Sequence, residues 1–202
     1  MSVYYYNGAQ ILTPLTIRSN EPTFDVDTVS LKKQRASQNV QRWEIEFNTI
    51  GTSDTVQDML IAAVSDNHLV DTMIMPQLPA VDEASTVTST AIPCAVVGDI
   101  GDTSVTLQVA GTNGTLPKGS FVKFSNHDKM YVTTADVNFD GSLNIAFNFY
   151  PALRTQVTTS HTLRTGNQAV LTYYKDIDNM AGITFTDGVL SNSGAISLIE
   201  AL

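Results

Sequence analysis

Charged and apolar side chains alternate from residue 42 to residue 47, and this alternation constrains the fold more than any other feature of the sequence. The apolar set is Trp43, Ile45 and Phe47, and the charged set is Arg42, Glu44 and Glu46. A period of two is that of a β-strand with one buried and one exposed face. We therefore expect a strand over residues 40 to 48, with the apolar set in the core.

Further short strands are expected along most of the chain. Residues 9–31 favour two strands around a turn, and residues 93–154 favour about five strands separated by turns at Asn113-Gly114, Lys118-Gly119 and Asp140-Gly141. Asp140-Gly141 in particular predicts a β-hairpin. Strands are also expected over 168–175, 182–186 and 195–202. Charged residues make up only 15% of the chain, so part of its surface is expected to lie against partners.

One helix is expected, just after the alternating strand. Asp54 is a good N-cap residue, Gln57 follows at the spacing of a capping box, and apolar residues then recur at helical spacing as far as Asp66. Residues 76–91 have the Pro, Ser and Thr content of a connector, and the polar residues 32–39 are expected to form an exposed loop.

These expectations combine into a mainly β architecture with one short α-helix. We predict a discontinuous β-rich domain of residues 1–90 and 166–202, interrupted by an inserted small β-barrel domain of residues 91–165. No repeat of fixed period is visible in the chain.

The charge balance argues against specific binding to nucleic acid. The formal net charge is −9, and only 11 residues are Lys or Arg, whereas binding to phosphates requires clustered positive charge. The single cysteine, Cys94, excludes an intrachain disulfide and is expected to be buried. The N-terminal residues do not resemble a signal peptide, and no stretch approaches the roughly 18 apolar residues of a membrane span. We expect a protein that folds in a cytoplasm without a membrane segment.

The sequence offers no convincing catalytic or cofactor site. His68, His127 and His161 lack metal-ligand spacing and are expected in surface loops, and no phosphate loop or nucleophile motif is present. Residues 136–141 match the first half of a calcium loop, but Phe147 stands where the loop requires a bidentate Glu. We therefore expect a strand after Gly141, no bound metal, no cofactor and no enzymatic activity.

Two clusters are candidates for contacts between subunits. Four of the 11 positive charges, Lys32, Lys33, Arg35 and Arg42, lie within eleven residues of an otherwise acidic chain. Opposite surface potentials fix the register between partners, so this segment is expected to dock on the acidic surface of an adjacent copy. The second cluster is Tyr4, Tyr5 and Tyr6. It is expected to pack on a neighbouring subunit, and a sugar-stacking platform is the alternative.

Several segments together resemble structural proteins of the tail tip of tailed bacteriophages. They are residues 31–35, 41–47, 97–107, 118–122, 131–132, 144–154 and 197–201, which occur in the same order. The resemblance implies a tail-tube-like β-sandwich that closes into a ring of six copies around the tail channel. It also implies contacts with other tail-tube and baseplate proteins, and a location in the virion tail.

Two other classes of function remain open. A receptor- or carbohydrate-binding β-module would require exposed aromatics, for example Phe121, Phe124 or Tyr131, on the inserted barrel. A wall-degrading hydrolase would require paired carboxylates or a metal in a cleft, and the sequence does not identify such a pair.

Overall fold

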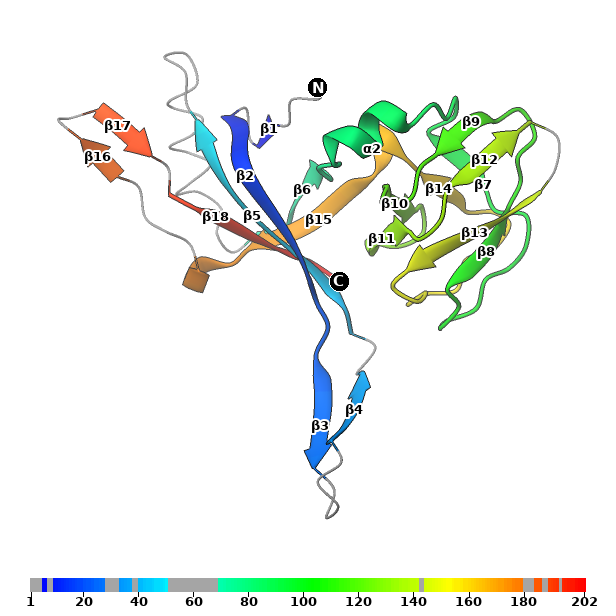
Figure 1. Cartoon of the computed structure of the whole chain (residues 1–202), viewed down its shortest axis with the longest axis horizontal. Coiled ribbons are helices and arrows are strands. Elements are labelled where there is room, and N and C mark those ends of the chain that lie inside the picture. Colours follow the sequence, from blue (N-terminus) through cyan, green and yellow to red (C-terminus); the bar gives the residue numbers. More distant parts are fainter. Residues whose placement is uncertain are drawn as a thin grey trace. The chain divides into compact units, whose positions relative to one another are not determined.

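The computed structural model describes residues 5–6, 9–27, 33–37, 40–50, 69–141, 144–179, 184–186, 189–192 and 194–202 (Figure 1). The protein is mainly β, as the sequence predicts. Its first strands are β1 (Tyr5–Tyr6), β2 (Ala9–Asn20), β3 (Thr23–Asp27), β4 (Lys33–Ser37), β5 (Arg42–Ile50) and β6 (Asp71–Ile74). Then come helix α2 (Pro79–Ala84) and strands β7 (Ala91–Pro93), β8 (Ser104–Leu107), β9 (Asn113–Leu116), β10 (Phe121–Phe124), β11 (Met130–Thr133), β12 (Val137–Asp140), β13 (Ile145–Tyr150) and β14 (Thr162–Arg164). The chain ends with 3-10 helix η1 (Gly166–Gln168), β15 (Val170–Lys175), 3-10 helix η2 (Ile177–Asn179), β16 (Thr184–Thr186), β17 (Val189–Asn192) and β18 (Ile196–Glu200).

The chain divides into two compact units, and one interrupts the other in sequence. The sheet unit comprises Tyr5–Leu69 and Tyr174–Glu200, and the barrel unit consists mainly of Val70–Tyr173. The insertion predicted at residues 91–165 lies within the barrel unit. The barrel unit is longer because it also holds β6, α2 and most of β15.

The sheet unit is built on antiparallel strands in the order β1-β2-β5-β18. Ile45 on β5 stands opposite Ile17 on β2 and Leu198 on β18, so these residues share one face. Trp43, Ile45 and Phe47 are all buried, which confirms the expected face of the alternating strand. On the same face the buried carboxylate of Glu200 accepts a hydrogen bond from the Trp43 backbone N–H at 3.1 Å.

Strands β3 and β4 form a hairpin that continues the ribbon of β2 and β5 (Figure 1). Residues 33–37 were expected in an exposed loop, and this expectation is wrong. In this ladder Asp25 stands opposite Arg35 and Asp27 stands opposite Lys33. The pairing of Lys33–Ser37 could not be predicted from their charges, because no apolar period accompanies them.

The barrel unit contains strands in the order β7-β14-β10-β11-β13-β8. Its first and last strands are joined, because the Ala95 N–H donates to Thr106 O and the Gln108 N–H donates to Pro93 O, each at 2.8 Å. The sheet therefore closes on itself, and its interior is filled by apolar side chains. This core consists of Ile92, Cys94, Val105, Leu107, Val109, Leu116, Val122, Phe124, Tyr131, Val137, Phe139, Phe147, Phe149, Leu153, Val157 and Leu163.

The hairpin predicted at Asp140-Gly141 and the turn predicted at Asn113-Gly114 are both wrong. Strand β12 pairs with β9, and β13 pairs with β8 and β11, so Asp140-Gly141 does not join two paired strands. Asn113 and Gly114 begin strand β9 instead of forming a turn. A Cβ atom at position 114 would collide with the backbone of Thr86, which runs beside β9 and donates its N–H to Thr115 O at 3.0 Å. Glycine at 114 therefore permits close backbone approach. The turn at Lys118-Gly119 is confirmed.

The segment expected to be an irregular connector contains helix α2. Pro79 occupies its first turn, where the missing N–H of proline is tolerated because no intrahelical partner exists there. The helix predicted for residues 54–66 lies outside the described residues. In the part of the chain that the structure describes, no helix is long and apolar enough to cross a membrane.

Candidate functional site

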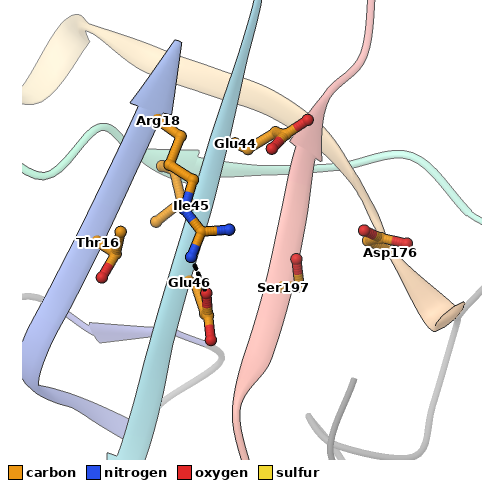
Figure 2. Close-up of a pocket in the computed structure, with 7 residues that line it drawn as sticks. All are labelled: Thr16, Arg18, Glu44, Ile45, Glu46, Asp176 and Ser197. Atoms are coloured by element: carbon orange, nitrogen blue, oxygen red, sulfur yellow. Dashed lines mark hydrogen bonds and ion pairs between the residues drawn. The ribbon is translucent and has the colours of Figure 1, made fainter. Parts of the chain in front are cut away.

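The solvent face of the sheet unit carries a shallow polar groove of about 210 Å³. Figure 2 shows its lining, which is contributed by β2, β5, β18 and the residue after β15. The lining residues are Thr16, Arg18, Glu44, Ile45, Glu46, Asp176 and Ser197. Arg18 reaches from β2 to Glu46 on β5, where Nη2 lies 2.9 Å from Oε2 (Figure 2). Both side chains are largely exposed, so this ion pair contributes little to stability.

A second hollow of about 360 Å³ adjoins the first and shares Glu44 with it. Its lining residues are Asn20, Pro22, Val40, Arg42, Glu44, Tyr174 and Ile199. Asn20 Nδ2 donates to Glu44 Oε1 at 2.7 Å, and Arg42 Nη1 donates to the Tyr174 hydroxyl oxygen at 3.2 Å. The carboxylates of Glu44 and Glu46 are thus engaged by neighbouring side chains in a groove open to solvent, an arrangement suited to contact with a polar protein surface.

The predicted interface residues of the basic cluster lie on the hairpin and at the start of β5. Lys33 and Arg35 are in β4, directly opposite Asp27 and Asp25. Arg42 is exposed and faces the second hollow, seven positions after Arg35 in sequence. Lys32 lies outside the described residues. The structure therefore places Lys33 and Arg35 on one hairpin and Arg42 on the neighbouring strand of the same unit.

The three tyrosines near the N-terminus are separated by the fold. Tyr4 lies outside the described residues, and Tyr5 is the first residue of β1. Tyr6 is only 1% exposed and packs edge-on against Phe47, with ring centroids 5.3 Å apart. Its side chain is therefore part of the core of the sheet unit and offers no surface to a neighbouring subunit.

The barrel unit contains a hydrogen-bonded cluster around His127 that the sequence analysis did not find. Asn126 Nδ2 donates to Gln156 O at 2.9 Å, which turns Asn126 Oδ1 toward His127 Nδ1, also at 2.9 Å. Nδ1 therefore carries the proton, and Nε2 accepts from the Tyr131 hydroxyl at 2.8 Å. Burial lowers the pKa of His127 to about 4, and the charge of Lys123 adds to this effect. His127 was predicted to lie in a surface loop. It is instead half-buried and neutral, and its hydrogen bonds hold the turn between β10 and β11.

Lys123 forms a second anchor beside this turn. Its nearly buried Nζ donates to Asp128 Oδ1 at 2.7 Å and to Val170 O at 3.2 Å, and the Thr172 hydroxyl donates to the same carboxylate oxygen at 2.9 Å. The hydrogen bond from Lys123 lowers the pKa of the Asp128 carboxyl group. Because Lys123 is neutralised by Asp128 and bonded to β15, we interpret the pair as an attachment of the turn to β15.

The other candidate ligand residues have structural partners. His161 Nδ1 accepts a hydrogen bond from the Thr158 N–H at 3.0 Å, and Asp136 Oδ1 accepts one from the Lys118 N–H at 2.7 Å. Strand β13 follows the partial calcium motif, as the alternation of its residues predicts. Within the described ranges, no group of three or more His, Cys, Asp or Glu side chains is placed to hold a metal ion. His68 lies outside those ranges.

Comparisons with known proteins leave the family of this chain open. No protein-family model matches it, and no curated protein matches it.

The aromatics that would form a glycan platform on the barrel are all buried. Phe121 is 7% exposed, and Phe124 and Tyr131 are fully buried. These three side chains therefore provide no stacking surface.

Proposed function

We propose that this chain is a structural subunit of the tail tip or baseplate of a tailed bacteriophage. In this proposal it assembles into a ring of six copies around the tail channel and connects the tail tube to baseplate proteins. The observation that carries the proposal is the edge of β2 that faces away from β5, most of which has no paired strand among the described residues. That strand pairs with β5 along one side, but on the other side only Ala9 and Gln10 have a described partner, in β1.

An open strand edge is a template for pairing with another chain. Its unpaired N–H and C=O groups can add a strand from a partner, and the resulting backbone hydrogen bonds supply affinity. Pro14 lies between Leu12 and Thr16, where the register of the β2–β5 ladder shifts, and such a bulge accommodates proline. The edge continues into the β3–β4 hairpin, whose only described ladder is between its own two strands. A two-stranded ribbon is marginally stable in water, so contact with a neighbour would stabilise it.

The charge of the protein suits a channel component. A net charge of −9 repels the phosphates of nucleic acid, so an acidic channel wall would let a duplex pass without retaining it. Glu44, Glu46 and Asp176 gather on the solvent face of the sheet unit (Figure 2). We choose a phage tail over other ring assemblies because several segments resemble tail-tip proteins, namely residues 31–35, 41–47, 97–107, 118–122, 131–132, 144–154 and 197–201.

The proposal is tested by the association state of the purified full chain. Native mass spectrometry and negative-stain electron microscopy, with the chain alone and mixed with tail-tube and baseplate proteins, are expected to show closed rings. A chain that remains monomeric at every concentration and with every tail partner would refute the proposal.

A matched pair of proline variants tests the role of the β2 edge. Successive N–H groups of a strand point to opposite sides, so Thr16→Pro and Ile17→Pro remove donors from opposite edges. The variant that removes an N–H facing β5 should break the β2–β5 ladder and lose thermal stability. The variant that removes an N–H on the opposite edge should keep its melting temperature and lose assembly. Intact assembly in the variant that keeps its fold would show that the open edge is not the contact.

A further inference from the structure

The side chain of His127 covers part of the apolar core of the barrel unit. Its ring lies tilted against that of Phe124, with centroids 5.9 Å apart, and meets the ring of Tyr131 edge-on at 5.6 Å. Both of these aromatic residues are fully buried, whereas His127 itself is half-buried. The turn between β10 and β11 therefore places a titratable ring between the core and the solvent.

The hydrogen bonds around His127 require its neutral form. Asn126 Nδ2 donates to Gln156 O, so Asn126 Oδ1 accepts from the ring Nδ1–H. Nε2 then accepts from the Tyr131 hydroxyl, whose oxygen also accepts from the Arg154 N–H at 3.4 Å. A second ring proton would point at an oxygen that already accepts a hydrogen bond, and it would displace the hydroxyl hydrogen from its acceptor.

The charged groups that face this ring oppose a positive charge on it. Lys123 on β10, Lys129 in the turn and His161 before β14 all disfavour the protonated ring. The one carboxylate in this set, Asp128, already accepts a hydrogen bond from Lys123 at 2.7 Å. That hydrogen bond lowers the pKa of the Asp128 carboxyl group, so the ion pair persists in mild acid. A proton on the ring therefore favours positions in which water solvates it.

We propose that the hydrogen bond from Asn126 to Gln156 is a latch on the β10–β11 turn, which acid releases while the barrel unit remains folded. Protonation moves the His127 ring into solvent, and the latch breaks because Asn126 is the neighbour to which the ring is bonded. The aromatic faces that the ring covered then become accessible. The ladders of β10 with β11 and β14, and of β11 with β13, do not include the latch, so the strands stay paired.

The strength of the latch depends on pH by linkage. Burial lowers the pKa of His127 to about 4 in the closed turn, whereas a ring released into water has its ordinary pKa of 6.5. Between these values the open turn binds a proton that the closed turn does not. The equilibrium constant for opening should therefore rise about tenfold for each pH unit of acidification, or about a hundredfold from pH 6.5 to pH 4.

Hydrogen exchange of side-chain amides, measured by NMR in the nitrogen-15-labelled full chain, tests the latch. The Asn126 amide reports opening, because its Nδ2 donates across the latch. The Gln77 amide is the matched control. Its Nε2 donates to Phe121 O at 3.1 Å, at the end of β10 that is remote from the turn. Both groups are primary amides, so the ratio of their exchange rates cancels the pH dependence of the exchange chemistry itself.

The Asn126 rate should rise about a hundredfold relative to the Gln77 rate between pH 6.5 and pH 4. His127→Gln keeps an acceptor toward Tyr131 and does not titrate, so its ratio should stay constant. Asn126→Ala removes the latch, so the midpoint of the His127 ring titration should move from about 4 toward 6.5. A constant ratio in the wild type, or an unchanged midpoint in Asn126→Ala, overturns the proposal. A parallel rise of both rates also overturns it, because the barrel would then open as a whole.

Discussion

Lys123 in β10 and Asp128 in the turn that follows this strand form an ion pair in which Nζ lies 2.7 Å from Oδ1. Lys123 is 8% exposed and also donates to the backbone of Val170. The pair therefore joins the turn to β15 in the barrel unit.

Lys123→Met, which keeps the length of the side chain and removes its charge, should destabilise the protein. Both hydrogen bonds of Nζ to Asp128 and Val170 are lost, so we expect a loss of about 1 to 3 kcal/mol in the free energy of unfolding. Urea denaturation measures the change. Lys118→Met, at an exposed position of the same unit, is the matched control and should change stability by less than about 0.5 kcal/mol. Equal effects of the two variants would contradict the anchoring role.

His127 should make stability depend on pH between about 6.5 and 4. Its folded pKa of about 4 lies below the unfolded value of 6.5, so in this range the unfolded chain binds a proton that the folded chain does not. Stability is thus complete above pH 6.5 and should fall by roughly 2 to 4 kcal/mol as the pH drops to 4. Denaturation of the wild type and of His127→Asn across this range measures the contribution. An NMR titration of the His127 ring with a midpoint near 6.5 would contradict it.

Gly98→Ala should destabilise the barrel unit by crowding. The added Cβ would lie 2.6 Å from Val105 Cγ1 and 3.0 Å from Leu153 Cδ1, both in the core. Overpacking of this kind costs about 1 to 3 kcal/mol. Val105→Ala removes the nearer methyl group, so the double variant should lose less stability than the sum of the two single variants. Strict additivity in this cycle would exclude the crowding.

Cys94 should resist alkylation in the folded protein. It is 2% exposed, and burial raises its pKa to about 11, so very little thiolate is present at pH 8. Mass spectrometry after iodoacetamide treatment should show an unmodified native chain and a singly modified chain in denaturant. The introduced thiol of Ile100→Cys is exposed and serves as the positive control. Rapid modification of native Cys94 would show that the barrel opens readily.

Features that depend on side-chain period could be predicted from the sequence. The buried positions Trp43, Ile45 and Phe47 follow from their alternation with charged residues, and the burial of Cys94 follows from its apolar neighbours. The basic cluster was also visible, because charge is a property of each residue. Residues 33–37, which include Lys33 and Arg35 of this cluster, were nevertheless predicted to form a loop. No local feature of the sequence reveals that Arg35 stands opposite Asp25.

The groove on the sheet unit and the cluster around His127 depend on residues that are distant in sequence. Arg18 meets Glu46, and Asn126 meets Gln156, only after their strands and turns are in place. The hairpin expected at Asp140-Gly141 failed for the same reason, because β12 pairs with β9. The sequence by itself determined the mainly β class, the buried faces and the charge, since each is set by a residue and its near neighbours. Only the tertiary structure decided which strands pair and which polar groups meet, because these choices depend on the free energy of packing the whole unit.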